Sequence, residues 1–87
     1  MLESIDETVS VVMISSKKSN KSYPYKMLWR QSEVVFSEVT YHHIIREGRT
    51  ISHIFHTTDS MTDYKLILNT QYLTWRLLEV SDGNTQS

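Results

Sequence analysis

The sequence contains no cysteine, one proline and only two glycines among its 87 residues. The lack of cysteine excludes a disulfide framework and a thiolate nucleophile, and it fits a reducing compartment, so we expect a cytoplasmic location. Two glycines are too few for a glycine-rich phosphate-binding loop, and no serine stands in the Gly-x-Ser-x-Gly turn of acyl-transfer enzymes. These scarcities argue against several classes of catalytic site.

The chain also lacks an excess of charge of one sign and a long apolar run. Nine Lys and Arg side chains against ten Asp and Glu give a formal charge of -1, so there is no general electrostatic reason to bind nucleic acid or anionic lipid. The first residues are acidic where a signal peptide would be basic, and the apolar runs are far shorter than the ~20 residues that cross a bilayer. We therefore expect no contact with a membrane.

The chain does contain recurring blocks of β-branched and aromatic residues with turn residues between them. This pattern, with 39% apolar residues, predicts one all-β domain over residues 1–80 and a disordered tail without apolar side chains over residues 81–87. We expect a small antiparallel meander of six strands that forms a curled sheet or a barrel-like closure. The expected strands are residues 8–15, 23–30, 33–45, 50–57, 63–69 and 72–80.

The third expected strand, residues 33–45, is long enough to need a bend. Its alternation falters at residues 34–36 and again at residues 42–45, where a bulge would change the facing of the side chains. A turn at residues 31–32 precedes this strand, and a hairpin turn at residues 46–49 follows it. The sequence therefore predicts a curved sheet rather than a flat one.

The last expected hairpin has a clear apolar face. In the register that pairs residue 69 with residue 72, one face is wholly apolar or aromatic and should lie in the core. The opposite face then sets Lys65 beside Arg76 and carries a basic spot. The pairs expected on the core face are Leu68 with Leu73, Leu66 with Trp75 and Tyr64 with Leu77.

The histidines are clustered, at His42, His43, His53 and His56. If the turn at residues 46–49 has two central residues, His42 lies opposite His53 and the two imidazoles share a face, which predicts a loss of stability below about pH 6. A bulge at Gly48 would separate them. A zinc or nickel site would need three or four ligands and the third is missing, so we predict no metal and no other cofactor.

Basic and aromatic residues of the expected strands suggest a second kind of site. Small β-barrels bind single-stranded nucleic acid by stacking bases on sheet aromatics between cationic side chains. The carboxylates are scattered without a close pair for acid and base chemistry, so we predict no catalytic residue and infer no small-molecule substrate. The candidate binding residues are Tyr25, Lys26, Arg30, His42, His53, Lys65 and Arg76.

Four short motifs follow one another in the order Trp29-Arg30, Glu38-Val39, Tyr64-Lys65-Leu66 and Trp-x-Leu-x-x-Val-x-Asp at residues 75–82. In this order they resemble a family of small bacterial domains of unknown function, over about three quarters of the chain. The resemblance implies a bacterial origin and genes for DNA repair nearby in the genome, and it implies no catalytic residue. Gln31 stands where the family pattern has glycine, which puts the tight turn there in doubt.

Two function classes therefore remain open, and a histidine metal site, with or without hydrolytic activity, is a third and weaker one. The first is a non-enzymatic protein-protein interaction or adaptor module whose partner is another protein or a second copy of the chain. The alternative is binding of single-stranded nucleic acid through the basic and aromatic sheet face.

Overall fold

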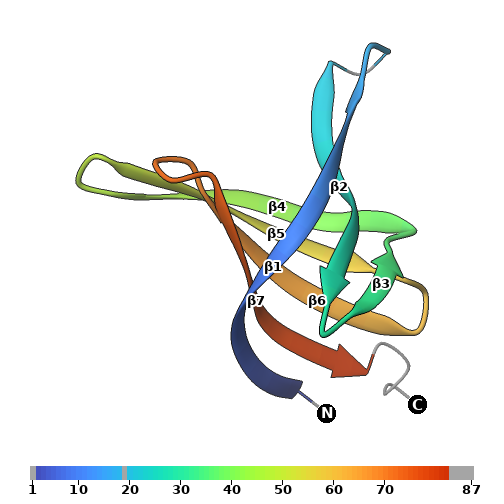
Figure 1. Cartoon of the computed structure of the whole chain (residues 1–87). Helices are drawn as coiled ribbons and strands as arrows, with labels where there is room; N and C mark the ends of the chain where they lie inside the picture. The colour runs from blue at the N-terminus through green and yellow to red at the C-terminus, as the bar shows by residue number, and fades with distance from the viewer. Residues whose placement is uncertain (1, 19, 83–87) are drawn as a thin grey trace.

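The computed structural model describes residues 2–18 and 20–82, which form seven β-strands in one antiparallel sheet of order β3-β2-β1-β7-β6-β5-β4 (Figure 1). The predicted all-β antiparallel fold is confirmed, with seven strands where we predicted six. The strands are β1 (Leu2–Ser16), β2 (Lys21–Trp29), β3 (Ser32–Val35), β4 (Glu38–Glu47), β5 (Thr50–Thr58), β6 (Thr62–Asn69) and β7 (Thr74–Asp82).

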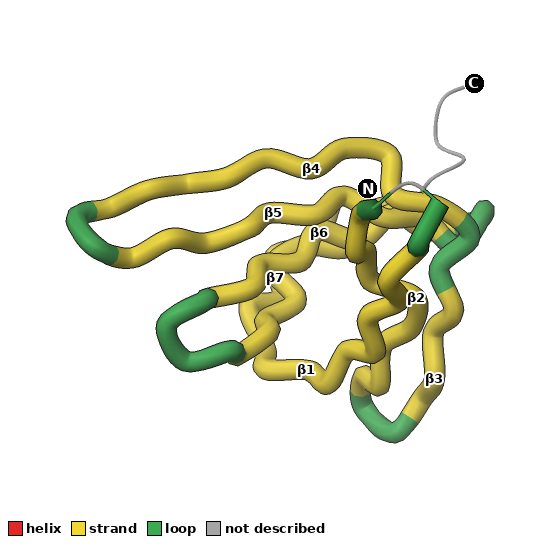
Figure 2. The backbone as a smooth tube through the Cα atoms, turned by 90° about the horizontal axis from the view of Figure 1, so that it is seen from above, coloured by secondary structure: helices red, strands yellow, loops and turns green. Residues whose placement is uncertain are grey.

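The sheet curls until its two ends lie close together. The edge strands β3 and β4 are joined by only two residues, Phe36 and Ser37. The Phe36 amide donates a hydrogen bond of 2.8 Å to the carbonyl of Tyr25 in β2, and the Ser37 amide donates one of 2.8 Å to that of Thr58 in β5. Seen from above, the strands surround a common centre (Figure 2). Within the described residues β3 and β4 do not pair, so the curled sheet stays open.

The hydrophobic core fills the inner face of this curl. Leu66 and Leu77 have no exposed surface, and Met27 keeps 1%. Because alternate residues of a strand point to the same face, β1, β2 and β5 each supply one of these side chains and β6 and β7 each supply two, while one more, Phe36, comes from the connection between β3 and β4. Burial of each such side chain stabilises the fold by about 1.5–3 kcal/mol. The buried cluster consists of Val9, Met27, Phe36, Phe55, Tyr64, Leu66, Trp75 and Leu77.

The predicted strand over residues 33–45 is wrong as a single element, because the structure divides it into β3 and β4. The interruption falls where the alternation first falters, since Phe36 turns into the core and is only 6% exposed. The second irregularity is a register shift between Val39 and Tyr41 instead of one at residues 42–45. The turn before β3 is also one residue earlier than predicted, because Trp29 pairs with Ser32.

The β4–β5 register differs by two residues from the predicted one. His42 pairs with Phe55 and His53 pairs with Ile44, so the two histidines are diagonal neighbours instead of directly opposite. Glu47 pairs with Thr50, which makes Gly48, with φ of 60°, the first of the two central residues of the turn. A shift of two residues keeps every side chain on its predicted face, because the side-chain period of a strand is two.

The β6–β7 hairpin is shifted in the same way. Leu66 pairs with Leu77, and Leu68 pairs with Trp75. Leu73 lies in the turn between the strands, where it is 74% exposed and has a φ of 56°, so its predicted place in the core is wrong. The side chain of Asn69 holds this turn by accepting backbone hydrogen bonds of 2.9 and 3.1 Å from the two residues 71 and 72.

The two ends of the described chain pair with each other. β1 begins at Leu2, six residues before the predicted strand, and its early residues pair with β7. Ser81 pairs with Leu2 and Asp63, and Asp82 pairs with Thr62. These two residues are therefore strand, which corrects the predicted start of the tail at residue 81. Residues 83–87, the rest of that tail, lie outside the described residues.

Candidate functional site: a cleft between two hairpins

The β1–β2 and β4–β5 hairpins extend from the curled sheet in different directions (Figure 1). Between them lies a cleft of about 470 Å³, which we call the hairpin cleft and which falls within the usual range for ligand pockets of about 300–1,000 Å³. Its wall combines aromatic and apolar side chains with polar ones. The lining residues are Lys21, Ser22 and Tyr23 of β2, Ser37, Val39, Thr40, Tyr41 and His42 of the connection and β4, and Phe55 of β5.

The hairpin cleft follows from the shortness of β3. β3 pairs with β2 only from Lys26 to Trp29, which leaves the earlier part of β2 without a neighbour on that side. β4 is the other edge strand and is ten residues long. In the described part of the chain, two strand edges therefore border the cleft without a strand partner. Backbone N–H and C=O groups on such edges are available to pair with another extended chain.

His42 of β4 and His53 of β5 lie side by side on one face of their hairpin. Nε2 of His42 lies 2.8 Å from Nδ1 of His53, so one imidazole donates a hydrogen bond and the other accepts it. The His42 ring also stacks on Phe55, with centroids 4.3 Å apart and planes within 3°. Burial lowers the pKa of His42, and the charges of His53, His43 and Lys21 lower it further. The lowered pKa favours the neutral form of the His42 imidazole, whose ring offers the cleft an aromatic surface.

The other two histidines lie on the opposite face of the same hairpin, around Tyr41. Its ring is 5.2 Å from that of His43 and 5.5 Å from that of His56. Burial lowers the pKa of His56, and the charge of Lys65 adds to the effect. In the described residues no group of three or more potential ligands is close enough to hold a metal ion. The histidines thus form two pairs on opposite faces instead of one cluster.

Each of the four basic residues proposed as binding candidates is paired with a carboxylate. The structure therefore does not assemble them into one basic face, and the predicted neighbours Lys65 and Arg76 each contact an acidic residue instead of forming a basic spot. The nitrogen-to-oxygen distances are 3.1 Å for Lys26–Glu33, 2.6 Å for Arg30–Glu7, 4.0 Å for Lys65–Glu79 and 2.8 Å for Arg76–Asp6.

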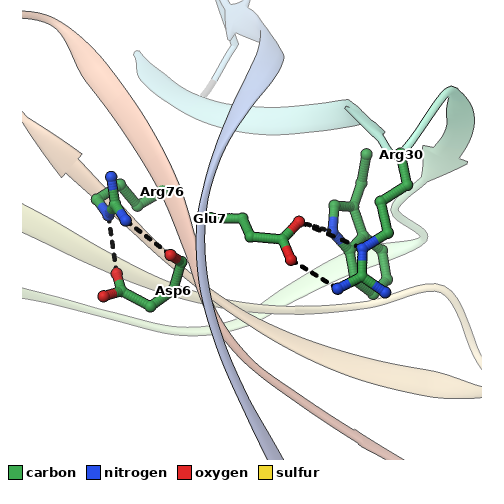
Figure 3. Close-up of polar contacts among 5 residues, drawn as sticks. Asp6, Glu7, Arg30 and Arg76 are labelled. Atoms are coloured by element: carbon green, nitrogen blue, oxygen red, sulfur yellow. Dashed lines mark hydrogen bonds and ion pairs between the residues drawn. The ribbon is translucent and has the colours of Figure 1, made fainter.

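Two of these pairs originate from adjacent residues of β1. Asp6 has a φ of 55° within an irregularity of the β1–β7 register. The side chains of Asp6 and Glu7 point to opposite sides of the strand (Figure 3). Glu7 accepts hydrogen bonds from Arg30 and, at 2.9 Å, from Nε1 of Trp29. These hydrogen bonds lower the pKa of Glu7, and the bond from Arg30 has the largest effect. The arginines therefore hold β1 in place, and the carboxylates of Asp6 and Glu7 offset their positive charge.

Of the predicted binding residues, only His42 lines the hairpin cleft. Tyr25 is 39% exposed. It is the extra residue of β2 at the point where the register with β1 shifts. The candidate binding residues named from the sequence do not include Lys21, Tyr23 and Tyr41, which line this cleft together. No local pattern brings them together, because the curvature of the whole sheet does so.

Comparison with family models, with curated proteins and with solved structures gives no match for this chain. The resemblance to a family of small bacterial domains therefore stays a prediction. Within the described residues, no helix has the length and apolar character needed to cross a bilayer.

Proposed function

We propose that this chain is a non-enzymatic interaction module that binds an extended segment of another protein at the hairpin cleft. The observation that carries the proposal is the outer edge of β4, which no described strand pairs with and which borders an aromatic cleft. Peptides commonly bind by adding a strand to such an edge, with backbone hydrogen bonds for affinity and side-chain pockets for specificity.

Exposed apolar side chains on β4 support this role. Tyr41 is 58% exposed, Ile44 46% and Ile45 37%. Natural edge strands are usually protected by charges, prolines or short length. β4 has ten residues and carries charge only at its ends, at Glu38, Arg46 and Glu47. A long edge with an apolar middle section therefore suits the addition of a strand, whether from another protein or from a second copy of the chain.

The test is a selection of displayed random dodecapeptides against the ¹⁵N-labelled protein, followed by NMR mapping of a selected peptide. We expect amide shifts along β4 and in residues 21–23 of β2, with little change along β3. Lysine at two edge positions, Tyr41→Lys with Ile45→Lys, should abolish the shifts, whereas Val35→Lys on the other edge strand should not. Peptides that bind only elsewhere, or none at all, would refute the proposal.

Single-strand nucleic acid binding is the second candidate, favoured by one observation. Lys21, Tyr23, Tyr41 and His42 line the same cleft, and cations with aromatic rings are the usual means of holding unpaired bases. The paired state of Lys26, Arg30, Lys65 and Arg76 weighs against the sheet face first considered for this role.

A further inference from the structure

The nine basic side chains divide into two groups that occupy different parts of the fold. Four of them form the ion pairs on the curled sheet. For the other five, no carboxylate partner lies within the described residues. All five are on the two hairpins that border the cleft: Lys17, Lys18 and Lys21 on the β1–β2 hairpin, and Arg46 and Arg49 on the β4–β5 hairpin.

Acidic residues show the reverse distribution. Residues 10–23 contain three basic and no acidic side chains, and residues 41–53 contain two basic and one acidic. The rest of the chain therefore holds four basic and nine acidic side chains. A net charge of -1 conceals a molecule with positive hairpins and a negative sheet. Such a separation attracts an anionic partner to one end and repels it from the other.

We propose that the segment bound in the hairpin cleft is acidic, an extended peptide with glutamate or aspartate at alternate positions. This inference rests on the proposed function and specifies its partner. Lys21 stands on the β2 wall of the cleft, and Arg46 lies near the end of the β4 edge along which the segment would run. The strand edge favours a polypeptide over a nucleic acid, because backbone pairing with a strand requires peptide N–H and C=O groups.

The experiment compares two fluorescein-labelled decapeptides by anisotropy, one alternating valine with glutamate and one alternating valine with glutamine. The exposed cations of the two hairpins supply about a tenfold preference for the acidic peptide at ~50 mM salt. Because exposed charges are screened by salt, the preference should fall at ~500 mM. Single-stranded dT10 serves as the third probe.

Two matched variants, each losing two positive charges, locate the effect. Lys18→Gln with Lys21→Gln should remove most of the preference, whereas Lys26→Gln with Lys65→Gln, on the sheet, should retain it. Circular dichroism checks that both variants are folded. Residues 18, 26 and 65 keep exposed surface, and the ion pairs at 26 and 65 are partly exposed, so both variants should fold.

The outcomes separate this inference from the proposed function. Equal binding of the two decapeptides would overturn the acidic partner and leave the peptide site standing. Failure of both decapeptides and of the selected dodecapeptides would overturn both. Tighter binding of dT10 than of the acidic decapeptide, lost in the Lys18→Gln and Lys21→Gln variant, would assign the cleft to nucleic acid and overturn the inference.

Discussion

Leu66 and Leu73 provide a matched test of the β6–β7 register, because the same substitution removes the same atoms at both positions. Leu66 has no exposed surface, whereas Leu73 is 74% exposed in the turn. Truncation of a fully buried leucine to alanine costs about 2–5 kcal/mol, through lost burial and the cavity left behind. An exposed position away from special contacts changes stability by about 0.5 kcal/mol or less.

The expected difference is large compared with the stability of a domain of this size. At about 0.05–0.15 kcal/mol per residue, 87 residues give a free energy of unfolding of about 4–13 kcal/mol. Leu66→Ala should therefore remove a substantial share of it. At about 4–8 °C per kcal/mol, a loss of ~3 kcal/mol lowers Tm by about 12–24 °C.

Urea denaturation followed by tryptophan fluorescence measures both variants, since Trp75 lies in the core and Trp29 packs against it. Circular dichroism in the same titration checks that the two probes report one transition. We expect a much lower midpoint for Leu66→Ala and an almost unchanged one for Leu73→Ala. A loss above ~2 kcal/mol for Leu73→Ala would place that side chain in the core, as the alternation of residues alone predicts, and would refute the register described above.

Three further predictions concern a turn, a buried hydroxyl and the histidines. Arg30 and Gln31 have positive φ values of 51° and 66°. Because glycine adopts such a φ without strain, Gln31→Gly should raise the free energy of unfolding by up to ~1 kcal/mol in a urea titration. A lower free energy of unfolding would show that the turn is not strained. Thr57 is 1% exposed and its hydroxyl lacks a described partner, so Thr57→Val should stabilise by about 1 kcal/mol; a lower Tm would contradict this. The pKa values of His42 and His56 in the folded state lie below 6.5. The unfolded chain therefore takes up protons first, and the free energy of unfolding should fall as the pH drops from about 6.5. Coinciding thermal melts at pH 7.5 and 5.0, or an equal loss of stability in a His42→Gln and His56→Gln variant, would reject this.

The sequence predicts which side chains face the core better than it predicts which residues of neighbouring strands pair with each other. The alternation of residues places Leu66, Trp75 and Leu77 on one face, and the structure confirms them in the core. The registers of both hairpins nevertheless differ by two residues from those predicted. Turn length and turn type decide the register, and the alternation of residues cannot reveal a shift of two, because such a shift leaves every side chain on the same face. The turn at Gln31 also forms without glycine, since Trp29 pairs with Ser32 across it.

The site could be predicted only in part. The meeting of His42 and His53 follows from their shared face and survives the change of register. The ion pair of Arg76 joins it to Asp6, 70 residues away, and no local pattern indicates such a contact. The division of charge between hairpins and sheet likewise becomes visible only when the carboxylate partners are known. Long-range pairing and sheet curvature, which create the hairpin cleft, are properties of the whole fold.

The pairing of β1 with β7 has a consequence for the order of folding. The strands from β4 to β7 pair with their neighbours in sequence, so they can assemble early, whereas β1 must close a loop across almost the whole described chain. Closing a long loop costs chain entropy before the contacts that it allows can form, and this cost slows folding. We expect Val9→Ala in β1 mainly to accelerate unfolding and Leu66→Ala in β6 mainly to slow refolding, as stopped-flow kinetics would measure. The opposite result would mean that the first strand is placed before the meander is complete.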